Sequence, residues 1–462
     1  MMTRLVSSIS TVWGSLFLLT ACGHLTANPR PKPLPQDTYI QVYFNQNQAE
    51  GVNYTDPYRN IPRPGDNLEQ IIIDTIHSAK TSVDIAVQEF RLPNLAKELA
   101  NLHHKGVKVR IILENKYSSP LSQLTSSEIN QLDERDQKSY LDYFALIDQN
   151  KDKKLSTSEI NQKDALVILK NAGIPIIDDT SDHSKGSGLM HHKFVIVDQS
   201  TVIITSANFT LSDTIGDFTN PQSRGNANNL LKIESSELAK VFTQEFNLMW
   251  QNHQYGVNKP YRKPIQIKLD KTNITVKFSP NSSKITWNYT SNGLIENTLN
   301  NATKTVNLAL FVFSEQKLSN ALENRHQQGV KVRALIDPNF AFINYSEGLD
   351  MLGIAISNKC RYEKNNKPWK NPIKTVGVPQ LPSGDKLHHK FALIDDNIVI
   401  TGSHNWSASA NYQNDETLLI LQNPVIAAHF QQEFERLYKN ALLGISQNLQ
   451  NKIKQNQEKC KK

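Results

Sequence analysis

The stretch LHHKFALIDDNIVITGSHNW, residues 387–406, has a second copy in the chain, MHHKFVIVDQSTVIITSANF at residues 190–209. Both copies carry His, Lys, Asp, Ser and Asn at one spacing: His191, Lys193, Asp198, Ser206 and Asn208, then His388, Lys390, Asp395, Ser403 and Asn405. Between Lys and Asn, two short runs rich in β-branched residues flank a polar turn, which predicts two buried strands. Side chains two positions apart on a strand share a face, so each copy sets an imidazole beside an ammonium.

This repeated pattern resembles the paired HxKxxxxD motifs of the phospholipase D superfamily, each followed by GSxN. The second copy matches that signature in full through Gly402, whereas the first has Thr205 in the glycine position. The resemblance implies that both motifs meet at one active site, with His191 as the nucleophile that forms a phosphohistidine. We assign His388 as the general acid and then as the base that activates water.

No cofactor is expected for the reaction itself. Chemistry at phosphorus without a metal needs a nucleophile, an acid for the leaving oxygen and fixed positive charge for the phosphoryl oxygens. Imidazole serves the first two roles because it titrates near neutrality and can be phosphorylated. We expect the phosphoryl oxygens to be bound by Lys193, Lys390, Ser206, Asn208, Ser403 and Asn405. Asp198 and Asp395 complete the catalytic motif, but their odd offset from His takes them off that strand face and predicts a more structural role.

A nucleophilic imidazole also needs an acceptor that fixes its far nitrogen. The second half offers Glu416 in NDETLL, residues 414–419, and the aligned first-half segment NANNLL, residues 226–231, has Asn228 there. In enzymes similar to this one, the orienting acid of one half serves the histidine of the other half. We therefore expect Glu416 to support His191 and Asn228 to support His388, which would separate the pKa values of the two histidines.

The chain reads as a duplication. A strand, helix and strand are predicted over residues 81–114 and again over residues 305–337, and a further helix and strand end at 172–177 and 352–357. This alternation predicts an α/β fold with two pseudo-twofold-related lobes, each a largely parallel mixed sheet flanked by helices. The lobes are expected at residues 39–255 and 256–445, within one chain that is expected to be monomeric.

The first half carries a small helical insertion, at about residues 117–165, that resembles an EF-hand calcium loop. Oxygen ligands fall at alternating positions, with Asp148, Asn150 and Asp152 as side-chain ligands, Lys154 through its carbonyl group, and Glu159 in the last position. Lys153 stands where the pattern has glycine, which costs about 1 kcal/mol if the backbone is left-handed there. The alternative is a polar helix–turn–helix whose charges face solvent.

The second half has its own insertion, residues 358–386, which is rich in lysine and contains Tyr362 and Trp369. It leads into His388, so we expect it at the rim of the site, where a basic loop with aromatic residues suits nucleic acid or an anionic headgroup surface. A solvated loop is the alternative.

The N-terminus resembles a bacterial lipoprotein precursor. Residues 1–21 have the layout of a signal peptide, and the ending Leu19-Thr20-Ala21-Cys22 resembles a lipobox, which implies lipidation of Cys22. A Pro-rich tether would follow over residues 22–38, and residues 446–462 form a basic tail. The expected location is the bacterial cell envelope, anchored to a membrane and facing the periplasm or exterior; an ordinary signal peptide is the alternative. Of the three cysteines, Cys360 and Cys460 could pair.

The charge of +7 and pI near 9.0 suit an anionic substrate or surface. The favoured function is a phospholipase D-type phosphodiesterase that hydrolyses or transfers a phosphodiester. Phospholipid is the favoured substrate because lipidated Cys22 would hold the site at a bilayer. A metal-independent endonuclease and a non-catalytic polyanion-binding lipoprotein are the alternatives.

Overall fold

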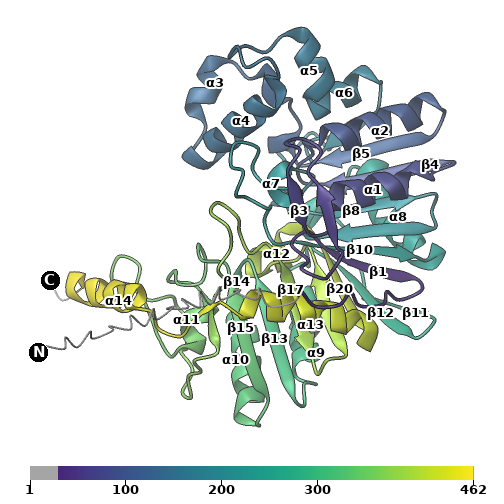
Figure 1. The fold of residues 1–462 in the computed structure, drawn as a ribbon. Helices are drawn as coiled ribbons and strands as arrows, with labels where there is room; N and C mark the ends of the chain where they lie inside the picture. Colours follow the sequence, from purple (N-terminus) through teal and green to yellow (C-terminus); the bar gives the residue numbers. More distant parts are fainter. Residues whose placement is uncertain (1–29, 461–462) are drawn as a thin grey trace, which may run out of the picture.

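The computed structural model describes residues 30–460, and its two large sheets correspond to the two predicted halves (Figure 1). The first half builds a seven-stranded sheet in the order β1 (Ile40–Phe44), β10 (Asn229–Glu234), β9 (Thr201–Thr205), β8 (Lys193–Val197), β4 (Ser82–Val87), β5 (Lys108–Leu113) and β6 (Ile176–Asp178). β4, β5 and β6 are parallel to one another, and the other neighbouring strands are antiparallel.

The second half builds a ten-stranded sheet. Its order is β11 (Ile265–Leu269), β12 (Thr272–Ser279), β20 (Asn414–Gln422), β18 (Ile398–Gly402), β17 (Lys390–Ile394), β13 (Thr305–Leu310), β15 (Lys331–Ile336), β16 (Val376–Val378) and β21 (Leu442–Leu443), with β7 (Leu189–Met190) paired to β20. The duplicated HxK strands β8 and β17 occupy equivalent central positions.

The predicted two-lobed α/β fold is confirmed, and two details of it are wrong. The sheets are mixed, but antiparallel neighbours predominate because β8, β9 and β10, like β17, β18 and β20, form meanders. Residues 352–357 do not form the third parallel strand of the second lobe. β16 takes that place beside β15, so this strand comes from inside the second insertion.

Helices cover both outer faces and fill the space between the sheets. α1 (Leu68–His77), α2 (Pro93–His104) and α6 (Ala165–Asn171) pack on the first sheet, and α9 (Ser291–Leu299), α10 (Gln316–Gln327) and α11 (Glu347–Met351) pack on the second. The inner core combines α8 (Ser236–Trp250) and α13 (Pro424–Tyr438) with strands of both sheets. The two lobes therefore share a core and do not form independent domains.

The insertion of the first lobe is a helical layer at one end of the molecule, seen at the upper left of Figure 1. It comprises α3 (Ser126–Gln131), α4 (Glu134–Ile147) and α5 (Thr157–Lys163), so the expected helix–loop–helix is present at residues 134–163. Short helices α7 (Leu211–Thr214) and α12 (Ala408–Tyr412) follow the two GSxN-type segments. Two small two-stranded sheets pair β2 (Asn53–Thr55) with β3 (Pro62–Pro64) and β14 (Phe313–Ser314) with β19 (Trp406–Ser407).

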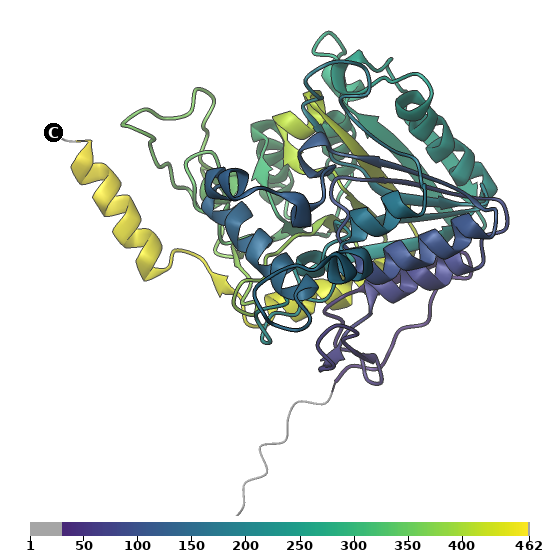
Figure 2. The same ribbon diagram turned by 90° about the horizontal axis from the view of Figure 1, so that it is seen from above.

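The C-terminal segment is ordered by a disulfide bond. Helix α14 (Gln447–Lys459) projects from the second lobe in Figures 1 and 2, and Cys460 at its end is bonded to Cys360. The basic tail is thus a helix fixed to the second insertion.

Part of the expected tether packs against the body. The Arg30 guanidinium donates to the carbonyl oxygens of Gln48 and Val52, and His429 of α13 contacts the Pro35 carbonyl oxygen. Residues 30–38 are therefore not a free linker. The signal peptide and Cys22 lie outside the described residues and stay predictions. Between residues 30 and 460, no helix has the length and apolarity needed to cross a membrane.

Candidate active site

The two HxK motifs reach each other through reciprocal backbone contacts between the lobes. The N–H group of His191 donates to the carbonyl oxygen of Asp415 over 3.0 Å, and the N–H group of His388 donates to that of Ala227 over 3.0 Å. β7 runs parallel to β20 at the first contact, and Ala227 and Leu387 form a parallel bridge at the second. Each histidine is therefore held by the strand that follows the other motif.

The side chain of His191 meets a buried carboxylate from the second lobe. Its Nδ1 atom lies 2.7 Å from Oε2 of Glu416, and the same oxygen accepts a hydrogen bond from the Ser403 hydroxyl over 2.7 Å. Because Nδ1 donates to the carboxylate, Nε2 is the nitrogen left to face a substrate.

The side chain of His388 makes the matching contact with an amide of the first lobe. Its Nδ1 atom lies 3.0 Å from Oδ1 of Asn228, which also accepts from the Ser206 hydroxyl over 2.7 Å. The Asn228 amide nitrogen donates to the backbone oxygens of Asp213 and Asn226, which fixes the orientation of the amide. The crossed contacts expected from the aligned NDETLL and NANNLL segments are thus present.

The two motif serines differ from expectation. Each hydroxyl donates to the partner of the opposite histidine and accepts a backbone N–H, from Asn229 in the case of Ser206 and from Thr417 in the case of Ser403. With these bonds made, the hydroxyls orient the histidine partners, and they do not serve as phosphate donors.

Two buried lysines complete the centre. Lys193 and Lys390 are each 1% exposed, and each ammonium donates to the carbonyl oxygen of its own motif histidine, over 3.0 Å and 2.6 Å. Burial lowers the pKa of Lys193 to about 8, although the carboxylates of Glu416 and Asp213 oppose that shift. Burial and repulsion by Lys193 lower the pKa of Lys390.

Both motif imidazoles are held in the neutral state. Burial lowers the pKa of His191 and of His388, and the positive charges of Lys193 and Lys390 lower both values further. Since each group responds to the charge of the others, the four basic groups share one space, which an anion would stabilise.

Asn208 and Asn405 fit the expected role of phosphate ligands. The Oδ1 atom of each is buried without a partner among residues 30–460, and the Nδ2 group of neither donates a hydrogen bond in that range. Asn208 also lines the cleft over His388, so its Nδ2 hydrogens are the donors available to an anion that enters.

Asp198 and Asp395 lie away from the chemistry, as their strand offset predicted. β8 and β17 carry them about 20 Å from the histidines. Asp198 accepts hydrogen bonds from the backbone N–H groups of Lys80, Thr81 and Ser82, and Asp395 does the same for residues 303–305. Partial burial acts to raise the pKa of both carboxyls, but these hydrogen bonds outweigh it and lower both pKa values. Their inclusion in the catalytic set is corrected: both hold the turn before the neighbouring strand.

The second histidine of each HH pair extends the crossed contacts by one residue. His192 contacts the Thr417 hydroxyl at 2.9 Å, and His389 contacts Asn229 at 3.3 Å and Glu433 at 2.9 Å. Together with Glu245 and Asp415, His192 forms a buried group with metal-ligand chemistry, but the ammonium of Lys259 bridges the two carboxylates at 2.7 and 2.8 Å. These contacts are structural.

Two residues near the site have no counterpart in the sequence pattern. Asp213 lies 3.8 Å from Nδ1 of His388. It follows Asn208 by five residues, and the corresponding residue of the second half, five after Asn405, is Ala410. His404, inside the GSxN segment, is buried with both ring nitrogens unpartnered among residues 30–460, and burial lowers its pKa to about 4. Asp213 could have been suspected only by comparing the two halves past the motif.

The basic second insertion does not surround the site. Trp369 is 3% exposed and donates to Ser319, so its ring is part of the outer core of the second lobe. The cleft over His388 is lined from this insertion only by Gly384 and Lys386. The expected basic and aromatic rim is therefore wrong except for Lys386.

The calcium-type loop between α4 and α5 is held by hydrogen bonds from its own backbone to two of its carboxylates. Asp148 accepts the N–H groups of Asp152 and Lys153, and Glu159 accepts those of Gln149 and Asn150. Lys153 has φ 65°, the left-handed conformation that the glycine of the pattern would adopt.

Two lobes that place one HxK motif each in a shared centre, backed by crossed partners, are the arrangement expected for the phospholipase D superfamily. The chain belongs to the family described as "Cardiolipin synthase, PLD-like domain", which matches residues 72–250 and 295–438.

Known proteins resemble parts of this chain. A mitochondrial cardiolipin hydrolase from Xenopus tropicalis is 32% identical over 140 residues, which are 30% of this chain and 56% of that protein. A phospholipase D from Rickettsia felis is 26% identical over 140 residues, 30% of this chain and 60% of the relative. The chain thus spans little more than half the length of these relatives. A phosphatidylserine synthase structure from Haemophilus influenzae Rd KW20 covers 93% of this chain and 94% of its own, with TM-score 0.50 and 12% identity, and shares the fold.

The crossed pairs predict unequal effects of their removal. Glu416→Gln should lower kcat by about 10²- to 10⁴-fold, because the carboxylate both orients His191 and stabilises its positive charge during attack. Asn228→Ala removes one neutral hydrogen bond from His388 and should cost about tenfold. Single-turnover rates on one phosphodiester measure both, with thermal melting as the folding control. Equal losses would contradict the different roles of the two histidines.

Proposed function

We propose that the protein hydrolyses or transfers the phosphodiester of a phospholipid through a phosphohistidine at His191. The observation that carries the proposal is the pair of buried imidazoles, each oriented through Nδ1 from the opposite lobe, beside two buried ammonium groups.

In the first step, Nε2 of His191 attacks phosphorus while the phosphorus–oxygen bond to the leaving alcohol breaks. Protonated His388 gives its Nε2 proton to that oxygen. In the second step, His388, now neutral, takes a proton from water or from an acceptor alcohol, whose oxygen attacks phosphorus and releases His191. Lys193, Lys390, Asn208 and Asn405 hold the non-bridging oxygens throughout.

The charge of the substrate completes this scheme. Burial, and then the charges of the two lysines, lower the pKa of both imidazoles, which suits the nucleophile and does not suit an acid. A bound phosphodiester anion offsets the lysines and favours protonation of one histidine. Asp213, at 3.8 Å, favours the positive charge on His388.

Phospholipid is favoured over nucleic acid for two reasons. The relatives that match the chain are described as a cardiolipin hydrolase and a phospholipase D. The aromatic and basic insertion that would have suited single-stranded nucleic acid lines the cleft only through Gly384 and Lys386, and Trp369 lies in the core.

A substrate panel tests the proposal. Purified protein should cleave phosphatidylcholine or cardiolipin vesicles in EDTA, and a phosphoryl label on the protein should survive alkali and be lost in acid. His191→Ala should abolish both signals. Cleavage of plasmid DNA alone would identify the endonuclease, and the absence of cleavage of all substrates would favour a polyanion-binding protein.

We also propose that the loop between α4 and α5 binds Ca²⁺ through Asp148, Asn150, Asp152, Glu159 and the Lys154 carbonyl group. The spacing of these residues between two helices, the backbone hydrogen bonds to Asp148 and Glu159, and the left-handed Lys153 support it. The ion would fix α4, whose side chains line the cleft, and would take no part in the chemistry.

The glycine position gives a sharp calcium prediction. Lys153→Gly should tighten Ca²⁺ binding about fivefold, because it removes about 1 kcal/mol of backbone strain. Lys153→Gln is the matched control, since it removes the charge and keeps the strain. Calorimetric titration measures all three proteins. Unchanged affinity in Lys153→Gly, or no binding at millimolar Ca²⁺, would overturn the site.

We propose that the protein is an envelope lipoprotein anchored through Cys22 and active as a monomer. The Cys360–Cys460 disulfide supports an oxidising location outside the cytoplasm, and both halves of the site come from one chain.

Cys22→Ser should move the protein from the membrane fraction to the soluble fraction of expressing bacteria and abolish incorporation of labelled fatty acid. Unchanged fractionation together with unlabelled wild-type protein would point to an ordinary signal peptide. Light scattering of the purified protein checks the monomer.

A further inference from the structure

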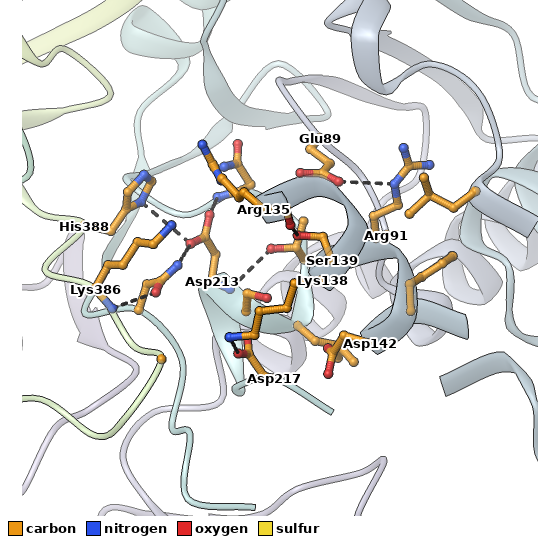
Figure 3. Close-up of a pocket in the computed structure, with 18 of the residues that line it drawn as sticks. Glu89, Arg91, Arg135, Lys138, Ser139, Asp142, Asp213, Asp217, Lys386 and His388 are labelled. Carbon is orange, nitrogen blue, oxygen red and sulfur yellow. Dashed lines mark hydrogen bonds and ion pairs between the residues drawn. The ribbon is translucent and has the colours of Figure 1, made fainter. Parts of the chain in front are cut away.

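The cleft over His388 has a wall that the family motifs do not include. Arg135 and Lys138 of α4 face it from the insertion, and Lys386 faces it from the loop before His388 (Figure 3). Acidic residues also line this space, namely Glu89, Asp142, Asp213 and Asp217.

The acidic side chains are already engaged. Asp142 accepts hydrogen bonds from the backbone N–H groups of Phe218 and Thr219. Asp213 accepts one from the backbone N–H of Asn208 and one from the side-chain amide of Asn226. Glu89 pairs with Arg91 at 3.3 Å, and Asp217 pairs with Lys138 at 3.4 Å.

Two cations remain without a partner. Between residues 30 and 460, neither the Arg135 guanidinium nor the Lys386 ammonium makes a hydrogen bond or an ion pair. Burial, and then the positive charge of Arg135, lower the pKa of Lys386, although the carboxylates of Asp213, Asp337 and Asp217 oppose that shift. The two cations therefore lie within reach of each other's charge. Both line the same cleft as Asp213 and His388 (Figure 3). Two like charges held together beside the acid favour an anion between them.

This positive site is confined to one side of the phosphorus position. The residue two positions before His388 is Lys386, whereas the residue two positions before His191 is Leu189. The hollow beside the segment before His191 is lined by Asp182, Ser184, Gly186, Ser187, Gly188, Tyr255, Val257, Asn258 and Gln413, without Lys or Arg. A polynucleotide carries phosphates on both sides of the cleaved bond, so a one-sided site fits a smaller diester with one further phosphate.

We propose that Arg135 and Lys386 form a subsite for a phosphate carried by the leaving alcohol of a lipid substrate. The side is assigned because both cations line the cleft over His388, the residue that protonates the leaving oxygen in the proposed mechanism. The identity of the lipid rests on the proposed function. The anion site rests only on the residues that line the cleft.

A matched pair of lipids tests the subsite. Phosphatidylcholine vesicles carry either phosphatidylglycerol phosphate or phosphatidylglycerol, which differ only by the second phosphate. Wild-type protein should prefer the former by about tenfold or more in kcat/KM, as one charge-assisted contact predicts. Arg135→Gln and Lys386→Gln should each reduce this ratio to near unity. Lys138→Gln is the control, since that lysine stands on the same helix and is paired with Asp217, and its ratio should stay at the wild-type value.

A binding measurement separates failure of the subsite from failure of the proposed function. Glycerol 3-phosphate should bind wild-type protein, and Arg135→Gln should weaken it about tenfold, whether or not any lipid is cleaved. Lipid cleavage with no preference, or equal weakening in Lys138→Gln, would overturn the subsite and leave the function standing. Cleavage of a single-stranded oligonucleotide in place of lipid, with the same dependence on Arg135, would overturn the lipid assignment.

Discussion

The structure depends on an exchange of backbone hydrogen bonds between its halves. The N–H of His191 is bonded to the Asp415 carbonyl group, and the N–H of His388 to that of Ala227. Side chains follow the same register, since consecutive histidines of one lobe meet consecutive residues of the other, Glu416 and Thr417 in one direction and Asn228 and Asn229 in the other. Neither half contains a complete site, which explains why the lobes share a core.

That exchange buries a group of charges that protein contacts only partly compensate. Lys193 and Lys390 are almost inaccessible, and each donates to a neutral carbonyl oxygen of its own motif. Burying cations without full pairing opposes folding, and the lowered lysine pKa values express that cost. A bound phosphate group would supply the negative charge that these lysines lack. The same buried cations that oppose folding therefore favour binding of the substrate.

Local patterns were sufficient for the elements and for the crossed partners. β4, α2 and β5 follow from hydrophobic periodicity, and the aligned NDETLL and NANNLL segments placed Glu416 and Asn228. Features that depend on packing between distant parts of the chain could not be predicted from the sequence. β16 replaced the 352–357 strand because an insertion supplied a better edge, and Trp369 entered the core because α10 offered it a pocket and a hydroxyl acceptor. The serine hydroxyls donate to an acceptor of their own lobe at 2.7 Å, Asn228 for Ser206 and Glu416 for Ser403, and the motif alone does not show these partners.

The residues that the two halves have in common and the residues at which they differ have different roles in this site. Residues that the two halves keep in common, the histidines, lysines and asparagines, surround the phosphorus position, where both reaction steps need the same cradle. Residues at which the halves differ each break the equivalence of the histidines: a carboxylate stands behind His191 and an amide behind His388, and Asp213 corresponds to Ala410. A nucleophile and an acid need different proton affinities, and the residues at which the two copies have diverged supply that difference for the proposed reaction.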